Sequence, residues 1–229
     1  LRMRQQKSIH NWAKSRAIVD QASRKIELGG TPRTAVFSGL TGQDYERMAD
    51  YFDYILPKHY YLHRGFDGLY STIARWVQTL GAWNPQLTEG DAFAVVKALF
   101  GIDLPGVRTL FDMEAGFPDE FFAEIVHGET RCALEAAGAD KVVCWVSTGR
   151  GPHAGDPMPA RDLLGILRAS EAAGLQRFVF HPEEMGVAEW RVLSTLCGEP
   201  WEENPDGYWP AGMQKTDAFN GGRKPPDRR

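Results

Sequence analysis

The sequence lacks the features that mark several large classes of protein. It has three cysteines in 229 residues, Cys132, Cys144 and Cys197. They are too far apart for a metal-binding pair, and their odd number does not indicate a disulfide framework. No apolar run reaches the ~20 residues that span a bilayer. No basic run precedes the tail GGRKPPDRR, and the net charge is −4, so we expect neither a membrane nor a nucleic acid as partner.

Further absences narrow the choice of fold. No G-x-G-x-x-G fingerprint of dinucleotide-binding sheets follows the first apolar run, and neither residue-level repeats nor low-complexity segments occur. The chain is 43% hydrophobic, which is enough for one sizeable core. It begins at Leu1, within what looks like the middle of a helical segment, so we expect it to be cut from a longer chain.

An alternation of apolar runs and helical patterns is the main positive signal. Each of five short apolar runs is followed by polar residues and then by a helical pattern that stops at glycine, which predicts five βα units. Helices are expected to be capped at Thr41 and Thr88, each with an acid three residues later as in a capping box. The expected strands are Thr34–Ser38, Asp53–Pro57, Arg108–Asp112, Val142–Val146 and Phe178–Phe180.

Near-continuous apolar strands predict a parallel sheet covered by helices. Polar and aromatic residues follow every strand rather than one crossover point, which favours a barrel over an open sheet. A full barrel takes ~250 residues. The expected fold class is therefore α/β, a parallel (β/α) barrel made of the last five βα units of a TIM-type barrel. This domain is expected over residues 1–200, with an irregular tail over residues 201–229.

Two carboxylates stand at the end of the third expected strand. If Arg108–Asp112 is a strand, Asp112 and Glu114 point to the same side. At the mouth of a barrel they would act as general acid, base or nucleophile. We expect Asp112 to lie deeper with a raised pKa, and Glu114 to lie nearer to solvent. The alternative is that one acid caps the helix that starts near Pro118 while the other binds a neighbouring arginine.

Residues that bind a substrate are expected in the loops after the other strands. The loops PKHYYLHRGFDG and STGRGPHAGDPM combine cations, imidazoles and aromatic rings that suit a polar ligand. Arg150 is expected to point toward the acids, because a guanidinium can donate two hydrogen bonds to one carboxylate. The expected substrate-binding residues are Lys58, His59, Tyr61, His63, Arg64, Trp83, Trp145, Arg150, His153, Asp156 and His181.

Three segments, YFDYILPKHYY, LFDMEAGF and GLQRFVFHPEEMGVAEWRVLSTLCGEPW, resemble the later strands of (β/α)₈ glycoside hydrolases and their uncharacterised relatives. The resemblance covers Ala35–Trp201 and rests on pattern, since the Asn-Glu pair of many such enzymes is absent from the strand ends. It implies a carbohydrate-active hydrolase that uses Asp112 or Glu114 on a sugar or oligosaccharide. No cofactor or metal is expected.

Two alternative functions stay open. The first is a carbohydrate-binding or degenerate barrel that keeps the pocket without turnover. The second is a metal-dependent barrel hydrolase that uses His59, His63, His153 or His181 with an aspartate. The spacing of His59 and His63 is that of zinc ligands on a helix, but the segment is expected to be strand and loop. The glycine-rich loop Ser147–Met158 could also cradle a phosphate.

Overall fold

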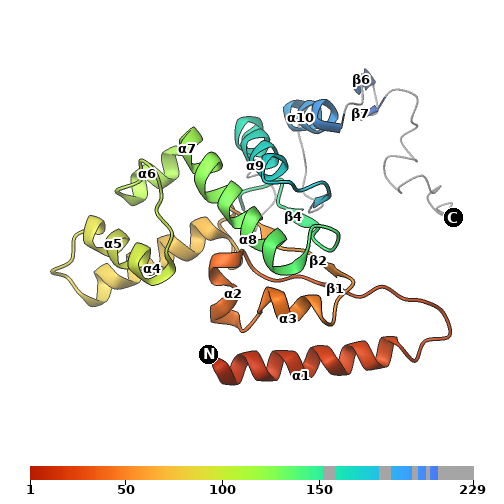
Figure 1. The fold of residues 1–229 in the computed structure, drawn as a ribbon. Coiled ribbons are helices and arrows are strands. Elements are labelled where there is room, and N and C mark those ends of the chain that lie inside the picture. The colour runs from red at the N-terminus through yellow and green to blue at the C-terminus, as the bar shows by residue number, and fades with distance from the viewer. Residues whose placement is uncertain (152–157, 181–186, 198–200, 205–206, 211–229) are drawn as a thin grey trace, which may run out of the picture.

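The computed structural model describes residues 1–151, 158–180, 187–197, 201–204 and 207–210. Helices surround a few short strands (Figure 1). The strands are β1 (Gly29–Gly30), β2 (Tyr54–Ile55), β3 (Lys58–His59), β4 (Cys144–Val146), β5 (Phe178–Phe180), β6 (Trp201–Asn204) and β7 (Gly207–Pro210). The helices are α1 (Arg2–Val19), α2 (Ala35–Thr41), α3 (Tyr45–Ala49), α4 (Leu69–Trp83), α5 (Glu89–Phe100), α6 (Leu110–Ala115), α7 (Asp119–Phe121), α8 (His127–Ala137), α9 (Ala160–Ala172) and α10 (Val187–Cys197), with a π-helical turn η1 (Phe122–Val126) between α7 and α8.

Two small parallel sheets form the centre of the molecule. β1 pairs with β2, while β3, β4 and β5 pair in that order. An isolated parallel bridge between Ile55 and Val142 links the two sheets. Pro57 accounts for the break between β2 and β3 because it has no N–H to donate to the ladder. Its carbonyl still accepts the N–H of Trp145 at 2.9 Å, so the carboxyl ends of the strands stay aligned.

The prediction of a barrel is wrong. The described residues form open parallel sheets of two and three strands, with no closed barrel among them. Thr34–Ser38, expected as a strand, lies mostly in α2, and Arg108–Asp112 runs into α6. A short apolar run fits a buried helix face as well as a buried strand, and period alone does not separate them. At Thr109 a capping box with Asp112 favours the helix.

Several other predicted elements are confirmed, while the helix start at Thr41 and the fully irregular tail are not. Asp53–Pro57, Val142–Val146 and Phe178–Phe180 contain β2, β4 and β5, and β4 pairs with β5 in parallel as expected. The capping box at Thr88 is present. The helix expected after Thr41 begins later, where the side chain of Asp44 caps α3. In the described part of the tail, β6 and β7 form an antiparallel pair.

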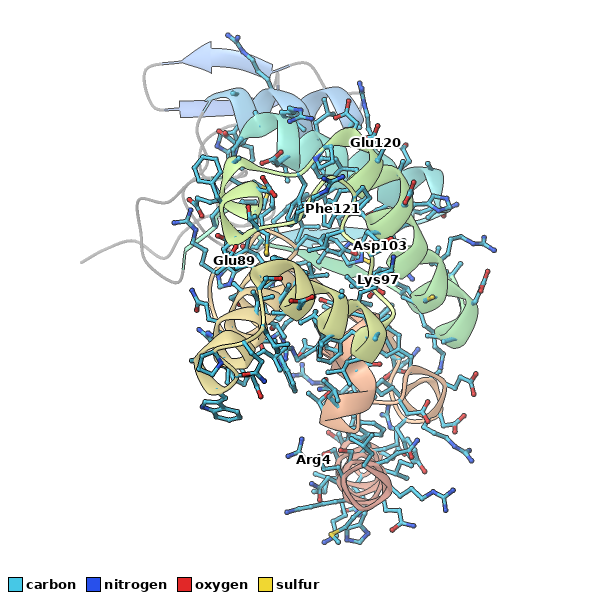
Figure 2. All side chains as sticks on the ribbon, turned by 90° about the vertical axis from the view of Figure 1, so that its left-hand side faces the viewer. Arg4, Glu89, Lys97, Asp103, Glu120 and Phe121 are labelled. Carbon is cyan, nitrogen blue, oxygen red and sulfur yellow. The ribbon has the colours of Figure 1, made fainter. Side chains whose placement is uncertain are left out.

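Glu114 lies in α6, and contacts with the neighbouring helices position α6. α4 and α5 pack side by side (Figure 1). Figure 2 shows Lys97 and Asp103 close together. Lys97, in the last turn of α5, forms an ion pair at 2.5 Å with Asp103, which follows the helix. Glu89, at the start of α5, accepts the N–H of Leu110 at 3.0 Å. These contacts tie the start of α6 to α5 and thereby fix the position of Glu114 in the last turn of α6.

Two titratable side chains, His59 in β3 and Glu129 in α8, have pKa values displaced by desolvation. The imidazole of His59 is buried, with Nε2 3.0 Å from Sγ of Cys144 and Nδ1 3.3 Å from Oγ of Ser170. Burial lowers the pKa of His59 to about 3, so the ring is neutral near pH 7. The carboxylate of Glu129 accepts the N–H of Val36 at 2.9 Å, and burial raises its pKa to about 7.

Alanine substitution at two helical glycines should change the stability of the protein in opposite directions. A Cβ on Gly165, in α9, would lie 2.8 Å from the ring of Phe122, whereas a Cβ on Gly81, in α4, would meet nothing within 4 Å. Gly165→Ala should therefore lower the free energy of unfolding by ~1–3 kcal/mol through overpacking. Gly81→Ala should raise it by ~0.5–1 kcal/mol because alanine favours the helix. Urea unfolding of both variants measures this, and a stabilising Gly165→Ala would contradict the packing.

His59 and Glu129 predict opposing pH dependences of stability. Between pH 6.5 and about 3 the unfolded chain binds the His59 proton and the folded chain does not, so acidification destabilises. Between pH 7 and 4.5 the folded chain holds the Glu129 proton, so acidification stabilises. Glu129→Gln removes this opposing effect. The free energy of unfolding of the variant should therefore fall by ~1.4 kcal/mol per pH unit as the pH falls below 6.5.

Chemical denaturation at several pH values measures that slope. The wild type and the exposed-site control Glu124→Gln should change little between pH 4.5 and 6.5, the range where the two effects oppose each other. An equally flat profile for Glu129→Gln would contradict the assignment of a neutral, buried His59.

Candidate functional site

The carboxyl ends of the parallel strands bring charged side chains to one edge of the sheets. Arg33 follows β1 by three residues, and Arg150 follows β4 by four. The N–H of Arg64, in the loop after β3, donates to the carbonyl of Arg150 at 2.5 Å, so the loops after β3 and β4 meet. We call this group of residues the sheet-edge cluster: Arg33, Lys58, Arg64, Asp67, Glu114 and Arg150.

Glu114 reaches the cluster from α6. Its Oε2 accepts the hydroxyl of Tyr70 at 2.6 Å, and its Oε1 pairs with Arg64. The bond from Tyr70, together with the charges of Arg64 and Arg150, holds the pKa of Glu114 below its usual range. Partial burial and the same bond raise the pKa of Tyr70 to about 12. Glu114 is therefore an ionised carboxylate with half of its side chain open to solvent.

Asp112 does not share this position. On a helix, residues two apart lie ~200° apart around the axis, so Asp112 and Glu114 do not face the same side. Asp112 accepts the N–H groups of Arg108 and Thr109, each at 2.9 Å, and these bonds lower its pKa. The expectation of a raised pKa is wrong. The geometry instead resembles the alternative, since Glu114 pairs with Arg64 and Asp112 caps a helix, but the capped helix is α6 and not the one expected near Pro118.

Arg33 anchors the other end of the cluster. Its Nη2 donates to Oγ1 of Thr72 at 2.7 Å and to the carbonyl of Phe66 at 3.2 Å, and desolvation lowers its pKa. Asp67 pairs with Lys58 and lies 3.9 Å from Nε of Arg33. The ring of Phe66 is 74% exposed, and the guanidinium of Arg33 lies 5.6 Å from its centroid. An open aromatic face thus borders the cationic side chains.

Arg150 and Asp162 complete the arrangement. The charge of Arg150 reaches Tyr70, Glu114 and Asp162, since it lowers the pKa of each. Of the two acids toward which Arg150 was expected to point, Glu114 feels its charge, while the pKa of Asp112 is set by its own helix terminus. Asp162, in the first turn of α9, is only 7% exposed, and its desolvation raises its pKa. Two carboxyl groups with pKa values displaced in opposite directions therefore both feel the charge of one guanidinium.

The remaining predicted substrate-binding residues divide between the core and the edge. His59 and Tyr61 are buried, with ring centroids 5.1 Å apart, and belong to the interior. Tyr60 packs between His63 and Trp145, with ring centroids 5.2 and 6.3 Å away, respectively. This places His63 and Trp145 beside the cluster.

Trp83 is the residue that the structure separates most clearly from this edge. It ends α4 and is 80% exposed. Tyr70 lies in the first turn of the same helix, which puts Trp83 ~20 Å away along the axis. His153, Asp156 and His181 lie outside the described residues.

Sequence reasoning missed five residues of this edge. A strand expected at Thr34–Ser38 would put the residue before it at the amino end of that strand, away from the edge where functional residues were sought. The two acids were overlooked since one sits in a loop and the other inside a helical pattern. The signal that was present is the density of charge and aromatic rings in HRGFDGLY, which contains three of the missed residues. The missed residues are Arg33, Phe66, Asp67, Tyr70 and Asp162.

Two properties of the described residues bear on the alternative functions. They contain no group of three or more His, Cys, Asp or Glu side chains placed to hold a metal ion. The histidine nearest to the sheet, His59, instead contacts Cys144 and Ser170. Among the helices in this part of the chain, none is both long and apolar enough to cross a membrane.

Comparisons with known proteins give no relative from which a function could be transferred. The chain matches no protein-family model, no curated protein and no solved structure. The resemblance to glycoside hydrolases therefore rests on sequence pattern alone, and the function has to be inferred from the side chains of the sheet edge.

Proposed function

We propose that the chain is a carbohydrate-active hydrolase whose site is the sheet-edge cluster. The observation that carries this proposal is the pair of carboxyl groups around Arg150. Glu114 has a lowered pKa and Asp162 a raised one. Cleavage of a glycosidic bond uses two carboxyl groups, one ionised and one protonated, and opposite pKa displacements assign these roles.

The roles follow from the surroundings of each acid. Asp162 is desolvated and would donate a proton to the departing glycosidic oxygen. Glu114 stays ionised because Tyr70 and Arg64 hydrogen-bond to it, and it would act as base or nucleophile. The exposed ring of Phe66 offers the flat apolar face on which the C–H side of a sugar stacks.

One observation favours a second function, carbohydrate binding without turnover. Both oxygens of Glu114 already accept hydrogen bonds, one from Arg64 and one from Tyr70. A carboxylate held in this way is a weaker base or nucleophile, because each bond stabilises its charge. A binding protein would show affinity for sugars with no release of product.

The first prediction concerns Glu114 and Asp162. Glu114→Gln and Asp162→Asn should each lower kcat/KM on a panel of nitrophenyl glycosides by ~10²–10⁴, the usual contribution of a general acid or base. Glu120→Gln, a change on the exposed face of α7 (Figure 2), is the matched control and should leave kcat/KM unchanged. Full activity in both site variants would refute the assignment, and binding without any turnover by the wild type would favour the second function.

The pH profile gives a second test of the same pair. Activity requires Glu114 ionised and Asp162 protonated, so kcat/KM should fall below the lowered pKa of Glu114 and again above the raised pKa of Asp162. In Asp162→Asn the alkaline fall should disappear from the remaining activity. An alkaline fall that persists in this variant would assign it to another group.

Asp112→Asn should lower stability and leave turnover nearly unchanged, unlike the variants of Glu114 and Asp162. Asp112→Asn weakens the capping box of α6, and the free energy of unfolding should fall by ~1 kcal/mol. The effect on kcat/KM should be less than about threefold, since Asp112 points away from Glu114. Thermal unfolding and steady-state kinetics measure both quantities. A large loss of turnover at unchanged stability would return Asp112 to the list of catalytic residues.

A further inference from the structure

One edge of the Arg150 guanidinium has an unfilled hydrogen-bonding capacity. The N–H bonds at Nε and Nη2 of an arginine run in parallel and match the two oxygens of a carboxylate or phosphate. In Arg150 both nitrogens are buried and find no hydrogen-bond partner among the described residues. A buried charged donor without an acceptor is costly, so this edge requires a partner that the described chain does not supply.

The neighbouring acids are engaged elsewhere. Asp67 pairs with Lys58, and Glu114 accepts from Arg64 and Tyr70. The cluster thus has four cations against two carboxylates, and both carboxylates are already bound. Asp162, on which the charge of Arg150 also acts, accepts no hydrogen bond from Nε or Nη2 of Arg150. The surplus of positive charge favours an anion from outside the chain.

We propose that the free edge of Arg150 binds an oxyanion carried by the substrate, so that the substrate class is acidic carbohydrates. A carboxylate on the sugar ring and a phosphate ester of a sugar share this chemistry. The sugar part of the inference rests on the proposed function, because Phe66 and Glu114 serve there to stack and cleave the sugar. The anion part rests on the geometry of Arg150 alone.

Calorimetric titration of the whole chain tests the proposal with D-glucuronate, D-glucose 6-phosphate, D-glucose and inorganic phosphate. At least one of the two acidic sugars should bind ten or more times more tightly than glucose, and which one does so identifies the oxyanion. Equal affinity for acidic and neutral sugars, or no binding of either acidic sugar, would overturn the proposal. Inorganic phosphate binding as tightly as the acidic sugars would mean an adventitious ion only and would also overturn it.

Substitution of Arg150 tests whether the acidic sugar binds at its guanidinium. Arg150→Lys keeps the charge but loses the two parallel donors, and it should weaken binding of the acidic sugar at least tenfold while binding of glucose stays unchanged. The control is Arg161→Lys, whose exposed guanidinium pairs with Asp119 on α7. An Arg150→Lys variant with wild-type affinity would contradict the site. Thermal unfolding checks that both variants fold, and the ligand comparison on the wild type does not depend on them.

Binding and hydrolysis can fail separately. Binding of an acidic sugar by a chain that cleaves nothing would support the oxyanion site and refute the hydrolase. Cleavage of neutral glycosides with no preference for acidic sugars would support the hydrolase and refute the oxyanion site.

Discussion

The segment from Tyr54 to His59 is the constraint on which the rest of the structure depends, because it is hydrogen-bonded on both sides. Toward β1, the N–H of Leu56 donates to Gly30 at 2.7 Å. Toward β4, the carbonyl of Pro57 accepts from Trp145 at 2.9 Å. These bonds align the ends of strands that are far apart in the sequence, and the loops after them therefore leave at one edge. Arg33, Arg64 and Arg150 meet there for this reason.

The short strands leave the positioning of the acids to helices. α6 carries Glu114, and its start is held by Glu89 of α5. α9 carries Asp162 in its first turn, on the side of the helix that is buried. One acid is therefore half open to water and the other is desolvated. The difference in hydration, together with the bonds to Glu114, displaces their pKa values in opposite directions.

The sequence allowed some parts to be predicted for physical reasons. β4 and β5 are dense in β-branched and aromatic residues and were found, and the capping box at Thr88 has the spacing that defines it. The helices α2 and α6 were missed because their apolar runs are as short as strands and carry no helical period. Asp162 was missed since only tertiary packing decides that a charged residue of α9 faces inward. Arg150 was a candidate because charge follows a recognisable strand, β4, and the structure places it in the loop after that strand.

The central claim is that one edge of the sheets holds two carboxyl groups with oppositely displaced pKa values, lowered at Glu114 and raised at Asp162. In model peptides aspartate is the stronger acid, with a pKa of ~3.9 against ~4.3 for glutamate. The account predicts that this order is inverted here. Carbon-13 NMR of the side-chain carboxyl carbons, followed over pH, measures both titrations directly. A midpoint for Asp162 above that of Glu114 is the result expected, and a midpoint for Asp162 at or below that of Glu114 would contradict the account.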